Sequence, residues 1–320
     1  MRLNVSESSS VGVFQTMHEQ MMKPVAYSQG VVIYCSSNGR LSFFNSPYVA
    51  HHGFSAVDIY PGCAYGEAAP SPVMGRVVKI RHVMCPKGRH FESTAFDCAV
   101  LLKSLENPDR LVKILHVKPY VEVGEVIEPG QKLGVLLRSG YFDFWTDPHI
   151  HVEIREPSDP LRARGGFKIE RLIEIEENDP LEELRGTVVE ARPEYALISL
   201  DNAVEVGLPA DIDGDMAILD AGIPHYGWIG AHTNGEPPIG ADVKLCGKKI
   251  GTIESVHRNM CLARCSDFDL RLRGVQVSLS LFLNLSSDPS IKIVPPKPGE
   301  LKMERSEEIS LEIGHKSSFG

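Results

Sequence analysis

Apolar and polar residues alternate along most of the chain in short runs. Stretches such as VAYSQGVVIYC, GRVVKIRHVM, AFDCAVLLKSL and LVKILHV are rich in β-branched residues and are bounded by Gly, Pro, Asn or Asp. This pattern is typical of short β-strands. Helices are predicted only around residues 14–22 and 179–185, where Asp179 would cap the helix and Pro180 would occupy its first position. The chain is therefore predicted to be all-β.

The β-rich pattern is interrupted once, by the charged stretch EIEENDPLEELRG at residues 174–186. We predict an N-terminal segment (1–24) and a first antiparallel β domain (25–175). A second, smaller β-rich accessory domain should follow (186–290). The Pro and charged residues after it predict a flexible tail (291–320).

Composition narrows the function classes. The 320 residues suffice for two domains with cores of their own, and 42% hydrophobic and 23% charged residues are typical of a soluble globular protein. The net charge of −9 argues against a nucleic acid or anionic membrane partner. No run approaches the ~18 apolar residues of a membrane span, and the N-terminus lacks a signal-peptide pattern. Seven cysteines without a secretory signal fit a reducing, cytoplasmic location.

One short stretch carries candidate chemistry. DPHIHVEI, residues 147–154, places His149 and His151 at alternate positions. On a helix they would point to nearly opposite sides, whereas on a strand they share a face about 6.6 Å apart. Ile150, Val152 and Ile154 fill the positions between and beyond them, which predicts a strand. Both histidines should therefore project from one face, with an aliphatic row on the other.

Further histidines precede this pair. YVAHHGFSAVDIYPG places His51 and His52 upstream of Asp58, and LVKILHVKP places His116 at the end of an apolar strand. Histidine and aspartate are zinc ligands, and three protein ligands plus water make a catalytic site. Zinc lowers the pKa of its bound water to about 7, and further histidines can move protons. Spacing alone leaves open both a zinc site and ordinary strand histidines.

The order of these motifs resembles a known family. After HHGFSAVDIYPG come SPVMGRVVKI, the lone histidine of LVKILHV, the hairpin pattern VEVGEVIEPGQKLGVLL and finally PHIHVEI. Together, over about residues 45–157, they resemble the lysostaphin/LytM-type zinc endopeptidases, the peptidoglycan-cleaving family built on a duplicated hybrid motif. The resemblance implies an antiparallel, barrel-like sandwich domain that binds Zn²⁺ and hydrolyses a peptide bond in a cell-wall-type or glycine-rich peptide.

The resemblance also implies roles for individual residues. His52, Asp58 and His151 would be the zinc ligands, and His116 and His149 would be the catalytic proton-handling or oxyanion-stabilising groups. Glu153, two residues beyond His151, would support a ligand rather than bind the metal.

Two departures from the family pattern matter. The first histidine normally stands four residues before the aspartate, but here His52 stands six before Asp58 and His51 seven. Either histidine could bind the metal, and His52 is preferred because it is nearer. These enzymes also act outside the cytoplasm, and this chain shows no export signal. The alternative function is therefore a non-hydrolytic metal- or ligand-binding module that retains the peptidase fold.

A second metal site is the weaker interpretation of the cysteines in the second half. Cys246, Cys261 and Cys265 lie near His257, but the CxxxC spacing of Cys261 and Cys265 is not that of a standard zinc knuckle. Buried free thiols are favoured.

Overall fold

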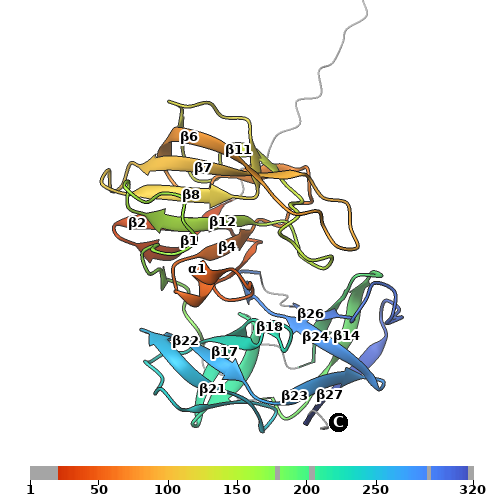
Figure 1. The fold of residues 1–320 in the computed structure, drawn as a ribbon. Coiled ribbons are helices and arrows are strands. Elements are labelled where there is room, and N and C mark those ends of the chain that lie inside the picture. The colour runs from red at the N-terminus through yellow and green to blue at the C-terminus, as the bar shows by residue number, and fades with distance from the viewer. Residues whose placement is uncertain (1–20, 177–180, 202–205, 287–289, 316–320) are drawn as a thin grey trace, which may run out of the picture.

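The computed structural model describes residues 21–176, 181–201, 206–286 and 290–315. They form two β domains in sequence order, one above the other in Figure 1. All named strand pairings are antiparallel. The all-β prediction is confirmed. The predicted helix at 14–22 lies largely outside the described residues, and Met22 belongs to a strand. In the described part of 179–185, Leu184 likewise begins a strand.

The first domain is a layered sandwich. Its elements are β1 (Met22–Ser28), β2 (Val31–Ser36), β3 (Arg40–Ser42), α1 (Val49–His52), β4 (Val57–Tyr60), β5 (Ala68–Pro70), β6 (Gly75–Met84), β7 (Phe96–Ser104), β8 (Leu111–Leu115), β9 (Val117–Pro119), β10 (Val126–Ile127), β11 (Lys132–Leu136), β12 (Ile150–Arg155) and β13 (Glu170–Arg171). A large sheet has the order β10-β6-β7-β8-β12-β4-β3, and the small sheets β13-β1-β2 and β5-β11-β9 lie beside it. Apolar side chains from all three sheets, including Ile33, Leu133 and Val152, form one core.

The second domain contains two closed β structures. Its strands are β14 (Leu184–Ala191), β15 (Ala196–Leu200), β16 (Leu208–Ile212), β17 (Asp215–Asp220), β18 (Gly222–Ile223), β19 (Trp228–His232), β20 (Asp242–Leu245), β21 (Lys248–His257), β22 (Met260–Cys265), β23 (Phe268–Leu272), β24 (Val275–Ser280), β25 (Leu283–Asn284), β26 (Ser290–Val294) and β27 (Glu308–His315). Strands β16, β17, β19, β22, β21 and β20 close into a barrel. Strands β24, β23, β27, β14, β15 and β26 form a second ring, which the β24–β26 pairing closes.

The C-terminal segment corrects the predicted flexible tail. Residues 290–294 and 308–315 are strands that pair with β15 and β14, so the end of the chain completes the second ring. Its apolar residues Ile291, Ile293 and Ile309 are buried in the core of the second domain. Proline and charge content suggested a tail because strand pairing with residues about a hundred positions earlier leaves no local signal.

The two domains share buried contacts. Strand β25 pairs with β3 and so extends the large sheet of the first domain. Ile218, Met260 and Leu262 of the barrel belong to the same apolar cluster as the first domain's core. The short helix α1 lies on the side of the first domain that faces the second (Figure 1). The second domain is therefore packed against the elements that carry the candidate ligands.

Candidate metal centre

Strand register places two of the predicted ligands opposite each other. In the β12–β4 pairing His151 lies directly across from Asp58, and in the β12–β8 pairing it lies across from Leu115, the residue before His116. Ile150, Val152 and Ile154 point into the core, so His151 and Glu153 occupy the other face of β12. The predicted strand is present with its aliphatic row in the core, but it includes only His151 of the histidine pair, because β12 begins one residue after His149.

The third member of the cluster is His51, not the predicted His52. Both residues lie on α1, where successive side chains point about 100° apart. His51 is fully buried and faces Asp58 and His151. His52 is half-buried and its ring lies 5.3 Å from that of Trp228, in the second domain. His52 was preferred because it is nearer to Asp58 in the sequence. The single helical turn instead directs His51 toward Asp58.

Two of the three donor separations match a tetrahedral metal site, and the third is a hydrogen-bond distance. His51 Nε2 lies 3.3 Å from His151 Nδ1 and 3.4 Å from Asp58 Oδ2. His151 Nδ1 lies 2.8 Å from Asp58 Oδ1. Bond lengths of about 2.0–2.1 Å around a tetrahedral zinc separate two donors by roughly 3.3 Å. Two nitrogens and a carboxylate are also ligands that zinc accepts, so the residues present fit this ion.

Hydrogen bonds behind the cluster orient both imidazole rings. The Nδ1–H of His51 donates to the carbonyl oxygen of Phe43 at 2.6 Å, and the Nε2–H of His151 donates to Glu153 at 3.0 Å. These bonds turn the Nε2 lone pair of His51 and the Nδ1 lone pair of His151 toward Asp58. Glu153 thus holds the ring of His151, the residue that the resemblance implied it would support. Lys113, 2.6 Å from Glu153, and Arg155, 3.1 Å from it, balance its buried charge.

Electrostatics favours a positive charge at the centre of the cluster. Burial alone would lower the pKa of His151, but its hydrogen bonds to Asp58 and Glu153 raise it to about 9. Burial alone would raise the pKa of Asp58, but His51, His149 and the hydrogen bonds to it hold that pKa well below its usual range. A metal ion between these groups would take the place of the proton on His151 Nδ1.

The two remaining predicted histidines lie beside the cluster. The rings of His116 and His149 are 5.0 Å apart, and His149 Nε2 is 3.7 Å from Asp58 Oδ2. The Nδ1–H of His149 donates to the carbonyl oxygen of Asp147 at 2.9 Å, which leaves Nε2 facing the cluster. Burial lowers the pKa of His149 to about 4, so the ring is neutral near pH 7.

Asp97, which sequence reasoning missed, anchors His116. Its two oxygens accept the His116 Nδ1–H at 2.5 Å and the His116 backbone N–H at 2.9 Å. Burial alone would raise the pKa of Asp97, but His116 lowers it to about 2. His116 also has a φ of +70°, a conformation that non-glycine residues rarely adopt and that recurs at functional sites. One signal was present: Asp97 interrupts the apolar run AFDCAVLL, where a buried acid needs a partner.

A pocket of about 630 Å³ opens onto these residues. Asp58, His116, His149 and His151 line one part of it. Much of the remaining wall is aromatic and comes from both domains, namely Tyr48, Tyr60, Tyr141 and Phe142 of the first and Tyr226 of the second. Four of the five predicted residues therefore line one cavity, and His51 rather than His52 completes the buried cluster with Asp58 and His151.

The second domain reaches the cluster through one residue, Phe43. Asp220 of β17 accepts hydrogen bonds from the Ser42 hydroxyl at 2.5 Å, the Phe43 backbone N–H at 2.6 Å and His232 Nε2 at 3.1 Å. The carbonyl of the same Phe43 residue accepts the His51 Nδ1–H. Asp220 is fully buried. The orientation of His51 therefore depends on a residue nearly 170 positions away in the sequence.

The comparisons with known families give the same division of the chain. Residues 32–171 match the domain of unknown function DUF8155, N-terminal domain, and residues 181–314 match the DUF8155 C-terminal domain. The chain carries both DUF8155 domains. No curated protein matches it. The C-terminal match to residue 314 includes the strands that replace the predicted tail.

The sequence predictions also concern membrane spans and further metal sites. Among the residues that the structure describes, no helix has the length and apolarity needed to cross a bilayer. Within the same residues, His51, Asp58 and His151 form the one metal-compatible group of this kind. Cys261 is buried in the barrel and burial raises its pKa to about 12, as expected of a packed thiol.

Proposed function

We propose that this DUF8155 chain is a zinc-dependent endopeptidase-like hydrolase, with His51, Asp58 and His151 as the metal ligands. The observation that carries the proposal is the spacing of the donor atoms, 3.3 and 3.4 Å from His51 Nε2, together with hydrogen bonds that aim both imidazole lone pairs at one point. The cluster opens onto a pocket that holds two further histidines, which a purely structural zinc site does not need.

The chain's own residues can handle the protons of a hydrolysis. When bound, zinc would lower the pKa of a coordinated water to about 7 and polarise a carbonyl. His149, neutral near pH 7, presents Nε2 beside Asp58 and can accept a proton there. The Nδ1–H of His116 donates to Asp97, so its Nε2 is the atom that can accept a proton and then pass it on. Two positioned groups of this kind are typical of general acid–base catalysis.

The pocket suggests a substrate of small cross-section. Aromatic rings crowd the histidines: Phe142 lies 4.8 Å from His149 and 4.6 Å from His116, and Tyr60 lies 5.0 Å from His149. A peptide backbone with small side chains reaches the cluster most easily between such walls. This supports the glycine-rich or cell-wall-type peptides that the sequence resemblance implied.

A second candidate function is a binding module that does not hydrolyse. It is favoured because the polar groups of the cluster already have partners within the protein. His151 bridges Asp58 and Glu153, and Lys113 and Arg155 balance the remaining charge. A network completed in this way holds the fold without catalysis. Measuring zinc content together with peptide hydrolysis separates the two functions.

The test compares neighbouring histidines in pairs. Zinc per chain is measured by mass spectrometry on the purified full-length protein, and hydrolysis is measured on pentaglycine and on peptidoglycan-type peptides. His51→Ala and His151→Ala should lose most of the metal, because two ligands remain of three. His149→Ala should keep zinc but hydrolyse on the order of 10²–10⁴-fold more slowly.

His52→Ala is the matched control, because it changes the adjacent residue of the same helical turn and should leave both zinc and activity near the wild-type level. Zinc retained in both ligand variants would refute the metal site. Zinc bound by the wild type without hydrolysis of any peptide would favour the binding module.

A further inference from the structure

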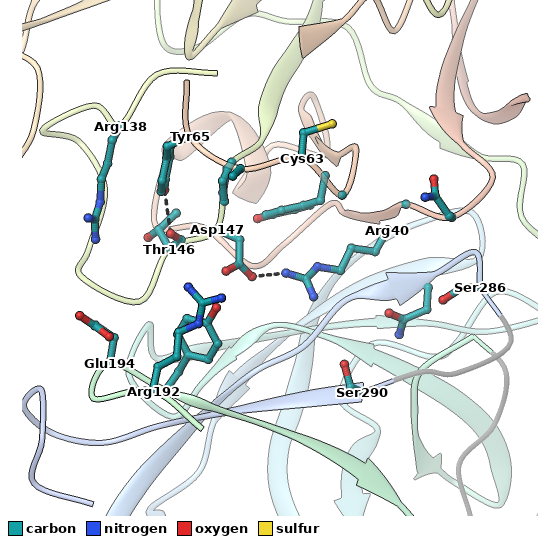
Figure 2. A pocket seen from close by; sticks show the side chains of 18 of the residues that line it. Arg40, Cys63, Tyr65, Arg138, Thr146, Asp147, Arg192, Glu194, Ser286 and Ser290 are labelled. Atoms are coloured by element: carbon teal, nitrogen blue, oxygen red, sulfur yellow. Dashed lines mark hydrogen bonds and ion pairs between the residues drawn. The ribbon is translucent and has the colours of Figure 1, made fainter. Parts of the chain in front are cut away.

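A second pocket lies between the two domains, next to the metal centre (Figure 2). Its volume is about 500 Å³. Tyr60 and Thr146 line both this pocket and the one at the metal centre, so the two cavities share a wall. Arg40 and Arg138 come from the first domain, whereas Arg192 comes from the second. The second cavity therefore borders the first, and its walls come from both domains.

Buried positive charge is in excess at one side of this pocket. Asp147 accepts contacts from both Arg40 and Lys292, so one carboxylate faces two cations. The side chain of Lys292 is 1% exposed and that of Arg40 is 20% exposed. Burial lowers the pKa of Lys292 to about 8 although Asp147 opposes this shift. Because buried charges need compensation, a negative group is favoured beside this ion cluster.

Arg138 has donors that protein groups do not use. Its guanidinium stacks 5.3 Å from the Tyr65 ring and 4.6 Å from the Phe91 ring, and it makes one long hydrogen bond of 3.4 Å to the Phe144 carbonyl. Its Nε is buried without a hydrogen-bond partner within the described part of the chain. A guanidinium held by aromatic stacking keeps its planar fork of N–H groups for a carboxylate or phosphate.

Arg192 approaches from the second domain. Its Nε is bound by Glu190, and Figure 2 shows its guanidinium reaching up toward Asp147. Glu194 lines the same wall. The two acidic residues of the pocket, Asp147 and Glu194, limit how much negative charge a ligand can bring. A group with a single negative charge fits this balance better than a phosphate dianion does.

We propose that this pocket binds a carboxylate of the same peptide that the metal centre acts on, with Arg138 and Arg192 donating to its oxygens. The assignment rests on the function proposed above. It gives the second domain a role in substrate selection, because Arg192 and Glu194 are supplied by that domain.

Binding of two peptides that differ only at this group tests the assignment. Acetyl-pentaglycine with a free carboxylate and its C-terminal amide are titrated by calorimetry into the full-length protein, with zinc removed by a chelator so that nothing is hydrolysed. The wild type should bind the carboxylate form about ten- to a hundredfold more tightly than the amide, the range of one or two charged hydrogen bonds. Arg138→Gln and Arg192→Gln should each remove most of that preference, chiefly by weakening binding of the carboxylate form.

Arg185→Gln is the control, because Arg185 belongs to the second domain and is 59% exposed in a pair with Glu183. It should keep the wild-type preference. Equal binding of the two peptides, or binding of neither, would overturn the proposal. Inorganic phosphate that binds more tightly than the peptide and displaces it would also overturn it, in favour of a phosphate group as the ligand. A carboxylate preference without any hydrolysis by the zinc-loaded protein would leave this site standing while the proposed hydrolase fails.

Discussion

Replacing Asp220 by asparagine tests whether the second domain holds the metal centre in place. The Asp220 side chain accepts three hydrogen bonds, from Ser42, from the Phe43 N–H and from His232. Asparagine offers one acceptor oxygen and one NH₂ group. If the NH₂ faces Phe43 and His232, the N–H groups of these two residues meet another donor in place of the carboxylate oxygen. If it faces Ser42, it meets an oxygen that already accepts the N–H groups of Phe44 and Asn45.

Both orientations therefore leave buried donors without acceptors. Each unsatisfied buried group costs about 1–3 kcal/mol, so the free energy of unfolding should fall by roughly 2–4 kcal/mol. Phe43, whose carbonyl orients His51, would lose the hydrogen bond that its N–H makes to Asp220 at the same time. Loss of such outer-shell support typically weakens zinc binding about 10–100-fold.

The assay measures both quantities separately. Urea unfolding gives the stability, and competition with a chromophoric chelator gives the zinc affinity, at temperatures where the variant is fully folded. Asp269→Asn is the control, because Asp269 is also a buried acid of the second domain but pairs with Arg271 on β23. It should lose stability and keep the zinc affinity. Wild-type zinc affinity in folded Asp220→Asn, or equal losses of affinity in both variants, would refute the coupling through Phe43.

Two further predictions concern acid stability and domain dependence. The folded-state pKa of Asp97, about 2 against a usual 3.8, should stabilise the fold by roughly 2 kcal/mol above pH 4, a contribution lost as the pH falls through about 2. Urea unfolding should therefore show wild type and Asp97→Asn converging in acid, and a pH-independent gap would contradict the cause assigned. A chain that ends at residue 176 lacks β25, the partner of β3, and should lose the cooperative thermal transition seen by circular dichroism. A sharp transition at the full-length temperature would show that the first domain folds alone.

The local pattern of residues was enough to predict the strand class and the histidine face. Alternation along DPHIHVEI places Ile150, Val152 and Ile154 on the core side of β12, and His151 and Glu153 on the other. This works because side-chain direction in a strand repeats every two residues and depends on neighbours alone. The charged stretch at residues 174–186 was visible locally, but the burial of its Ile175, Leu181 and Leu184 in the two cores was not.

Features that depend on which distant segments meet were decided only by the tertiary structure. His51 rather than His52 faces Asp58 because one turn of helix interrupts the extended chain, and that turn packs against the barrel of the other domain. Asp97 becomes the partner of His116 because β7 runs beside β8 in the large sheet. The segment after residue 290 becomes two strands because β14 and β15 offer it open edges.

The physical reason is the same in each of these cases. A strand's own sequence determines which of its side chains share a face. Which other strand it pairs with depends on contacts between segments that are far apart in the sequence. His51, Phe43 and Asp220 illustrate this most directly, since the hydrogen bonds that orient a candidate ligand join segments of both domains. The residue types at the site could therefore be predicted from the sequence, whereas their roles depend on contacts that only the folded chain makes.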